Sequence, residues 1–178
     1  MTNNPVSDPD EDEYASVWNV NTKGTVLVIG ALVAAMQKNN IATVVGRNGV
    51  RQIGRGSIVS LASGDSLIVE PFKGPYVASK HAALGIVKTA ALENTANQIR
   101  INALCPSWVD TPMMDTYFEL QPELRKKIKE FHPKKRMALP EEIAGAVLFL
   151  LSPGASYISG TGLAIDHGVL LSINTNSS

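Results

Sequence analysis

Two short apolar runs, with a long alanine-rich segment between them, constrain the fold of this chain more than any other feature. Residues 56–62 and 100–105 have the length and composition of buried strands, whereas residues 76–98 have those of a helix that is apolar on several faces. A strand, a helix and a second strand in succession predict a parallel sheet of the α/β class. Further helices are expected at residues 14–38, 115–131 and 140–151, and a last strand within residues 158–166.

The length and composition describe one globular domain with a balanced charge. The chain has 178 residues, of which 44% are hydrophobic, and its 16 Lys and Arg residues balance 16 Asp and Glu residues. A net charge of zero gives no support for a nucleic-acid partner. The single cysteine, Cys105, lies in an apolar run and is expected to be a buried thiol, which fits a reducing, cytoplasmic compartment.

The N-terminal residues and the apolar stretch after them show no targeting signal. Residues 1–13 are acidic and are expected to form a flexible, solvated arm, followed by a single domain over residues 14–178. The longest apolar block, residues 25–36, is shorter than the about 20 residues that cross a bilayer, so no membrane partner is expected. Because this block is apolar nearly all round, its helix should be buried or lie in a subunit interface.

Neither the glycine-rich segment nor the histidines predict a separate binding site. Residues 39–55 combine glycines with arginines and are interpreted as an exposed loop inserted between a helix and a strand. Such a segment can also cradle a phosphate, but the glycine spacing and the following helix of a phosphate-binding turn are missing. The three histidines, His81, His132 and His167, lack the spacing of a metal site, and we expect surface or structural roles for them.

A tyrosine and a lysine one helical turn apart are the strongest chemical signal in the chain. A Gly-Pro pair opens the predicted helix, which places Tyr76 and Lys80 on one of its faces. A free phenol has a pKa of about 10, and a neighbouring ammonium group should lower it toward the range that is useful for proton transfer. Ser63 follows the preceding strand, at the kind of strand end where sites form in open parallel sheets.

The order of these features resembles the short-chain dehydrogenase/reductase family: a strand, Ser63, a thirteen-residue gap, a Gly-Pro turn, then Tyr76 and Lys80. The resemblance implies that Tyr76 is the proton donor or acceptor and that Ser63 hydrogen-bonds the carbonyl or hydroxyl of the substrate. It implies that Lys80 binds the nicotinamide ribose and lowers the pKa of Tyr76. Residues 18–24 resemble the helix that carries a fourth catalytic residue, so Asn21 is expected to hold a water in a proton relay. A polar residue at a helix kink is the alternative.

Residues 106–113 resemble the family's Pro-Gly-x-x-x-Thr stretch, which passes over the nicotinamide. The resemblance implies that the backbone of Val109 meets the carboxamide and that the hydroxyl of Thr111 binds the carboxamide or a phosphate. Ser107 stands where glycine is usual and resists some backbone shapes that glycine adopts, so the turn is expected to differ. The family also implies a mobile lid at residues 115–131 and a homo-oligomer in which two apolar helices pair across a dimer axis.

The N-terminal part of the family fold has no counterpart in this sequence. The resemblance covers residues 14–171, which correspond to the C-terminal two-thirds of a family member. The first strand, the glycine-rich turn that cradles the dinucleotide pyrophosphate and the residue that selects NADP or NAD are not found. The predicted fold is therefore a partial Rossmann-like, doubly wound parallel sheet without its first strands. Its unpaired edge and uncovered apolar helix face should favour association.

Three functions are compatible with these features. The first is an NAD(P)-dependent oxidoreductase that interconverts a small-molecule carbonyl and an alcohol by hydride transfer; the resemblance is closest to members that tailor secondary metabolites. The second is an inactive remnant that associates with full-length subunits, because the glycine-rich turn is missing. The third is a serine hydrolase that uses Ser63 and a histidine, which is disfavoured because Leu61 and Asp65 occupy the positions where a nucleophile elbow needs glycines.

Overall fold

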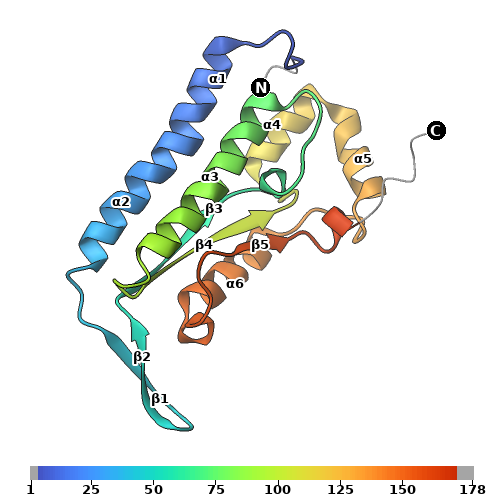
Figure 1. Cartoon of the computed structure of the whole chain (residues 1–178). Coiled ribbons are helices and arrows are strands. Elements are labelled where there is room, and N and C mark those ends of the chain that lie inside the picture. Colours follow the sequence, from blue (N-terminus) through green and yellow to red (C-terminus); the bar gives the residue numbers. More distant parts are fainter. Residues whose placement is uncertain (1–3, 172–178) are drawn as a thin grey trace.

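The chain folds around a three-stranded parallel sheet with helices on both of its faces (Figure 1). The structure is a computed structural model that describes residues 4–171. Its α-helices are α1 (Glu11–Val17), α2 (Gly24–Met36), α3 (Gly74–Glu93), α4 (Pro112–Leu120), α5 (Pro122–Phe131) and α6 (Pro140–Leu151). Its strands are β1 (Ala42–Gly46), β2 (Gly49–Gly54), β3 (Gly56–Leu61), β4 (Ile99–Pro106) and β5 (Gly162–Ile165).

The parallel sheet has the strand order β3-β4-β5, so β4 lies in the centre and β3 forms an edge. The helix α3 connects β3 to β4, which is the crossover that parallel neighbours require. This arrangement confirms the predicted α/β class and the strands expected at residues 56–62 and 100–105. The prediction of a partial sheet is also confirmed. Within residues 4–171 the parallel sheet has three strands, and no further strand pairs with the outer edge of β3.

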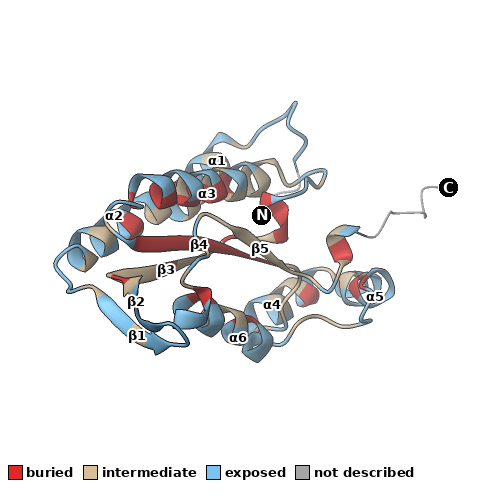
Figure 2. Ribbon diagram, turned by 60° about the horizontal axis from the view of Figure 1, so that its bottom comes forward, coloured by how far each residue is buried: buried red, intermediate tan, exposed pale blue. Residues whose placement is uncertain are grey.

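The two faces of the sheet bury two separate apolar clusters. Along β4, Ile101 and Cys105 join the cluster beneath α2 and α3, whereas Leu104 joins the cluster against α6. All but the last residue of β4 are buried, as Figure 2 shows. The polar residue Asn102 is satisfied there, because its side chain donates to the Ile158 oxygen at 2.9 Å. Burial on both faces accounts for the nearly continuous apolar sequence of the strand, and Cys105 is a buried free thiol, as predicted.

A nearly continuous helix runs from residue 11 to residue 36, and its middle is a π-helical turn, Trp18–Lys23. The carboxylate of Asp10 accepts a hydrogen bond from the Glu13 amide at 2.9 Å and caps α1. The acidic residues that follow are thus the first helical turn, where they complement the helix dipole, and the expected arm is shorter than predicted. Single π-helical turns inside α-helices are frequent at functional sites, and this one carries Asn21.

Three expected elements differ from the structure. Residues 39–55 are an exposed antiparallel hairpin of β1 and β2 instead of a loop, because Gly49 adopts the positive φ that a tight turn needs. The helix expected at residues 115–131 is divided into α4 and α5, because Gln121 precedes Pro122 and takes a non-helical conformation. The helix α3 ends earlier than residue 98, since Asn94 bonds back to the Ala90 oxygen at 2.9 Å.

The N-terminal helix leaves most of its apolar surface uncovered. In α2 only Ile29 is buried, while Leu27 and Val28 are 62% and 58% exposed. Its predicted burial is therefore not found, and the alternative of a subunit interface stays a prediction. The segment Glu11–Met36 is the one helix of residues 4–171 that is long and apolar enough to cross a membrane, on length and composition alone.

Candidate functional site

The carboxyl ends of the three parallel strands bring the predicted site residues to one edge of the sheet. Ser63 follows β3, residues 107–111 follow β4, and Asp166 follows β5. The 3₁₀ turn Gly64–Ser66, which begins directly after Ser63, packs against α3, the helix that carries Tyr76 and Lys80. This edge is where ligands bind in open α/β sheets.

The start of α3 is fixed by a close approach to the N-terminal helix. A side chain on Gly74 would collide with the phenol oxygen of Tyr14, so any other residue there would require the Tyr14 side chain to move. A proline occupies the first turn of α3, as predicted. The helix then presents Tyr76 and Lys80 on one face, with the Lys80 nitrogen 5.5 Å from the centre of the Tyr76 ring. The predicted pairing of these two side chains is confirmed.

The surroundings of Tyr76 keep its phenol protonated. Burial raises the pKa of Tyr76 above its usual value of 10.0. A hydrogen bond with Ser63 and the ammonium group of Lys73 lower this pKa, while the carboxylate of Asp65 raises it further. The net lowering expected from a neighbouring lysine is therefore wrong for the protein alone, because burial outweighs the nearby cation.

The ammonium group of Lys80 is held beside the end of β3. Its Nζ donates to the backbone oxygen of Leu61 at 3.4 Å, which uses one of its three donors. Burial lowers the pKa of Lys80 below its usual value of 10.5, whereas the carboxylate of Asp65 and the thiolate form of Cys105 raise it. A half-buried ammonium group with further donors suits an acceptor-rich partner such as the hydroxyl groups of a ribose.

A chain of hydrogen bonds ties the π-helical turn to α3 next to Lys80. The side-chain nitrogen of Asn21 donates to Oγ of Ser79 at 3.0 Å, and this Oγ donates to the Tyr76 backbone oxygen at 2.7 Å. The hydroxyl of Thr22 donates to the Ser79 backbone oxygen at 3.4 Å. The structure therefore places Asn21 beside the site and also at a helix irregularity. Its role in a proton relay stays a prediction.

The segment after β4 is held in place from two sides. The amide of Ser107 donates to the Ile165 oxygen of β5 at 3.1 Å. On the other side, the amide of Ala138 donates to the Trp108 oxygen at 2.9 Å, beside a parallel bridge between Val109 and Ala138. The segment that is predicted to pass over a nicotinamide is thus joined by backbone hydrogen bonds to the end of β5 and to Ala138.

The hydroxyl groups of Thr111 and Ser107 differ in their contacts: the first does not cap its helix, and the second contacts a histidine. Thr111 is the N-cap residue of α4, yet its side chain does not cap the helix, although capping is the usual role of threonine there. This arrangement suits the predicted contact with a carboxamide or phosphate. The hydroxyl of Ser107 instead lies 3.2 Å from Nε2 of His132. A glycine at position 107 could not make this side-chain contact, so the contact is what the serine adds at this position.

Two charged residues near Tyr76 were missed by the sequence analysis. Asp65 is 8% exposed, and its amide donates to Oγ of Ser63 at 3.1 Å; burial raises the pKa of its carboxyl group. The ammonium group of Lys73 lies 4.7 Å from the centre of the Trp108 ring, so it connects the loop after β3 with the segment after β4. Their closeness in sequence to Ser63 and Tyr76 is the signal that could have identified them.

The residues at this edge suit the nicotinamide half of a dinucleotide better than its pyrophosphate. Tyr76, Lys80 and Thr111 supply hydroxyl and ammonium groups of the kind that ribose and carboxamide groups bind. A pyrophosphate is typically cradled by a glycine-rich turn at a helix N-terminus, and none of the helices in residues 4–171 opens on such a turn. Within the same described range, no group of three or more possible metal ligands is found.

Known proteins that this chain resembles form one group. Residues 1–170 match the family model described as Enoyl-(Acyl carrier protein) reductase. The chain is 38% identical over 171 residues to Short-chain dehydrogenase anuF of Penicillium roqueforti, and 42% identical over 168 residues to Short-chain dehydrogenase RED2 of Pyricularia oryzae. These alignments cover 96% and 94% of this chain but 62% and 60% of the relatives, so the chain spans about three-fifths of their length.

A solved structure shows the same fold. ElxO with NADP bound superimposes with a TM-score of 0.81 over 97% of this chain and 64% of that chain. The sequence identity of 24% is low, so this likeness concerns the arrangement of helices and strands.

Proposed function

This chain belongs to the short-chain dehydrogenase/reductase family, and we propose that it carries a site for interconverting a carbonyl and an alcohol. The observation that carries the proposal is the grouping of Ser63, Tyr76 and Lys80, with the phenol between a hydroxyl and an ammonium group. These groups can exchange a proton with a substrate oxygen and orient that oxygen. A serine hydrolase is not supported, since Oγ of Ser63 accepts from the Asp65 amide and bonds the Tyr76 phenol.

Tyr76 exchanges the proton in this proposal, and Ser63 orients the substrate. The raised pKa of Tyr76 keeps the phenol protonated at neutral pH, and a protonated phenol is the form that donates to oxygen as a carbonyl becomes an alcohol. The hydroxyl of Ser63 hydrogen-bonds the same substrate oxygen. At neutral pH, Tyr76 therefore stands ready as the proton donor.

Lys80 and three further residues hold the cofactor and the proton path. A bound nicotinamide of NADP or NAD supplies or accepts the hydride. Lys80 binds its ribose through the donors that Leu61 leaves unused. The backbone of Val109 and the hydroxyl of Thr111 hold its carboxamide end, and Tyr76 lies against the same ribose. Asn21, which reaches α3 at Ser79, holds a water that connects Lys80 with solvent.

Replacement of the phenol tests the assignment. With NADPH or NADH and a panel of small carbonyl compounds, we expect Tyr76→Phe to lower kcat by at least about 100-fold, because general acid catalysis contributes about 10²–10⁴-fold. The melting temperature should stay close to that of the wild type. Tyr157→Phe is the matched control, since Tyr157 is fully exposed. Turnover retained in Tyr76→Phe would overturn the assignment.

A second candidate function is a non-catalytic subunit that associates with full-length relatives. Two observations favour it: the helices of residues 4–171 lack a glycine-rich opening turn, and both the β3 edge and the apolar surface of α2 are uncovered. In this reading, residues 14–178 are an incomplete domain that a partner completes. Titration with NADPH and NADH, with Lys80→Ala as control, separates the two candidates. Binding that is lost in Lys80→Ala supports the enzyme, whereas no binding by a folded chain that co-purifies with a relative supports the subunit.

The proposed substrate is a small carbonyl or alcohol with an apolar part. The loop after Ser63, which leads into the helix that carries Tyr76, exposes four apolar side chains, namely Leu67, Ile68, Val69 and Phe72. The fungal relatives and the reductase of a γ-butyrolactone in Streptomyces virginiae support a place in secondary metabolism. We expect the protein to act in the cytoplasm as a homo-oligomer that pairs through α2 and α3.

A further inference from the structure

A buried histidine lies directly behind the segment after β4, and the proposed reaction makes no use of it. His132 is 3% exposed and is the C-cap residue of α5, where its amide donates to the Ile128 oxygen at 2.8 Å. Its Nε2 lies 3.2 Å from Oγ of Ser107, the residue that stands directly after β4. The ring thus contacts the one position of this segment that departs from the usual glycine.

Two hydrogen bonds determine which ring nitrogen of His132 carries the proton. The backbone N–H of Lys134 donates to Nδ1 at 3.4 Å, so this nitrogen is the unprotonated one. In the neutral ring the proton then resides on Nε2, which donates to Oγ of Ser107. A second proton on Nδ1 would point at the Lys134 N–H, so the charged ring does not fit this arrangement.

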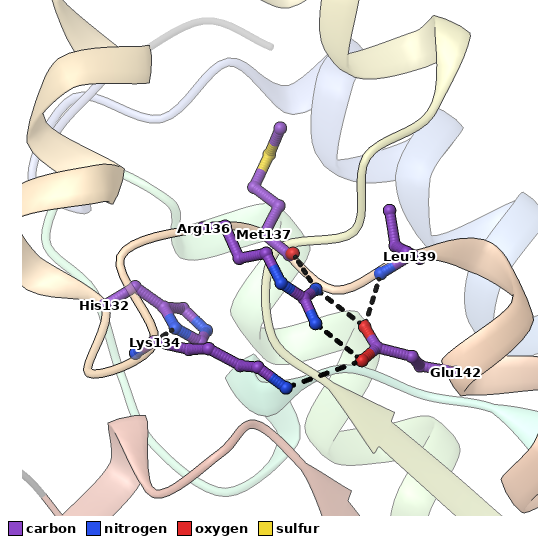
Figure 3. A network of polar contacts seen from close by, with 6 residues as sticks. All are labelled: His132, Lys134, Arg136, Met137, Leu139 and Glu142. Atoms are coloured by element: carbon purple, nitrogen blue, oxygen red, sulfur yellow. Dashed lines mark hydrogen bonds and ion pairs between the residues drawn. The ribbon is translucent and has the colours of Figure 1, made fainter.

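The loop that carries His132 is anchored to α6 by a network of ion pairs, which Figure 3 shows. Two N–H groups of Arg136 donate to the carboxylate of Glu142 at 2.8 and 2.7 Å, and the Leu139 amide donates to it at 2.8 Å. The ammonium group of Lys134 lies 3.7 Å from the same carboxylate. The loop that holds the His132 ring against the segment after β4 is therefore itself attached to α6.

We infer that His132, as a neutral imidazole, positions the cofactor-binding segment after β4 by holding Ser107 in place. Ser107 precedes Val109 by two residues and Thr111 by four, so a fixed Ser107 also fixes the groups that are proposed to hold the carboxamide. The cofactor part of this inference rests on the proposed function. Protonation of His132 adds a proton to Nδ1, which then faces the Lys134 N–H; the ring should shift away from this N–H and so loosen its contact with Ser107.

The charges that face the ring come from three elements. Asp166 and His167 approach from the end of β5, Lys134 and Arg136 from its own loop, and Glu142 from α6. Burial lowers the pKa of His132 below its usual value of 6.5; His167 and Arg136 act in the same direction, and Asp166 opposes them. The neutral form that the inference requires is accordingly the one present at neutral pH.

Imidazole NMR and amide hydrogen exchange test the inference without any cofactor. With its signal assigned through His132→Gln, the ring should carry its proton on Nε2, and this signal should move in Ser107→Ala. Amide exchange in residues 107–110 should become about tenfold faster in each variant, the loss expected for about one hydrogen bond. His81→Gln, which alters an exposed histidine of α3, should leave both observations unchanged. A proton on Nδ1 would overturn the inference. So would exchange that is unchanged in Ser107→Ala, a variant that keeps the ring in place if His132→Gln fails to fold.

A double-mutant cycle on NADH binding tests the cofactor part. Ser107→Ala and His132→Gln should each weaken binding about tenfold, and the double variant should weaken it no further, because both changes remove one interaction. Acidification should weaken binding by the wild type more than by the variants; NADH is used because it lacks the additional phosphate of NADPH, which titrates near a pH of about 6. Additive losses, or unchanged binding, would overturn the inference. Absence of binding by the wild type would overturn the proposed function together with the cofactor part, while the exchange experiment still decides whether His132 holds the segment.

Discussion

The groups around Tyr76 show how burial and charge compete at the scale of a single residue. Burial raises the pKa of the phenol, and the strongest opposing influence is the hydrogen bond with Ser63 and not a lysine. Lys80 lies over the ring, and burial lowers its own pKa below the usual value. The serine is therefore both a candidate substrate contact and the group that lowers the pKa of the tyrosine most.

Loss of the Ser63 hydroxyl should make Tyr76 a weaker acid. In Ser63→Ala, the pKa of Tyr76 is expected to rise further above its usual value, because the largest lowering influence is gone. Absorbance titration of the tyrosinate, with Tyr76→Phe to identify its signal, measures the change. Ser66→Ala is the matched control, since the Ser66 hydroxyl is buried without a hydrogen-bond partner in the described structure. An unchanged titration in Ser63→Ala would contradict this account.

Glu142 should make stability depend on acidity. The hydrogen bonds from Arg136 lower the pKa of Glu142 from 4.5 to about 2, so the folded state favours its charged form. Its contribution to stability is complete above the unfolded-state pKa of 4.5 and is lost as the pH falls toward about 2. Glu142→Gln should therefore reduce the pH dependence of the free energy of unfolding in that window, as measured by urea denaturation. Glu141→Gln, one residue earlier in α6, should leave it unchanged.

The sequence predicted contacts between residues that are close in the chain better than contacts between residues that are far apart in it. The pairing of Tyr76 with Lys80 follows from helical spacing and is confirmed. Burial raises the pKa of Tyr76, and helical spacing carries no information about burial, so an argument from the spacing of Tyr76 and Lys80 predicted the wrong direction. The partner of Ser107 is 25 residues away, at a histidine for which the sequence predicted only a surface or structural role.

At the scale of an element, the two glycines at the ends of β2 differ in one respect. Both have a backbone conformation that favours glycine, but only one of them also lacks room for a side chain. Gly49 and Gly54 both have positive φ, at 97° and 104°. A side chain at Gly49 would meet open space, whereas one at Gly54 would collide with the backbone oxygen of Gln98, which accepts the Arg55 amide at 2.8 Å. The hairpin thus begins in an exposed turn and ends in a tight junction with the sheet.

Alanine at these two positions should have unequal effects. Both substitutions place a side chain at positive φ, which costs roughly 1–2 kcal/mol when the strain is fully felt. Gly54→Ala adds a collision with backbone that cannot move without disturbing the start of β3, so it should lower the free energy of unfolding by at least about 1 kcal/mol more than Gly49→Ala. Urea unfolding of the two variants measures this difference. Equal losses would show that the junction adapts.

Sequence patterns predicted elements well where one physical signal dominates. The strands β3 and β4 are short, mostly apolar runs of the kind found in a sheet that is covered on both faces, and they were predicted within one residue. The hairpin was missed because its residues are mostly exposed, which leaves no apolar alternation to recognise. The break between α4 and α5 follows from Pro122, a signal present in the sequence but outweighed there by the apolar spacing.

At the scale of the whole molecule, two surfaces are left that a folded monomer rarely exposes together. One is the outer edge of β3, whose last residue, Leu61, is 58% exposed. The other is the apolar side of α2, which the sequence predicted to be buried or in an interface. Uncovered strand edges and apolar patches both favour association. The chain should therefore form oligomers through one of these surfaces.

Substitution of charged residues on α2 distinguishes the apolar side of α2 from the edge of β3 as the surface through which the chain associates. If two copies pair symmetrically through this helix, each substitution is present twice in the interface, so its cost counts twice. Burial of a Leu or Val side chain contributes about 1.5–3 kcal/mol, so Leu27→Lys combined with Val28→Lys should weaken dimerisation by well over about 100-fold. Sedimentation velocity over a range of protein concentrations would show the shift from dimer to monomer. Met113→Lys is the matched control, because Met113 is 80% exposed on α4. Association that persists in the double variant would instead place the contact at the edge of β3, where backbone pairing does not depend on these side chains.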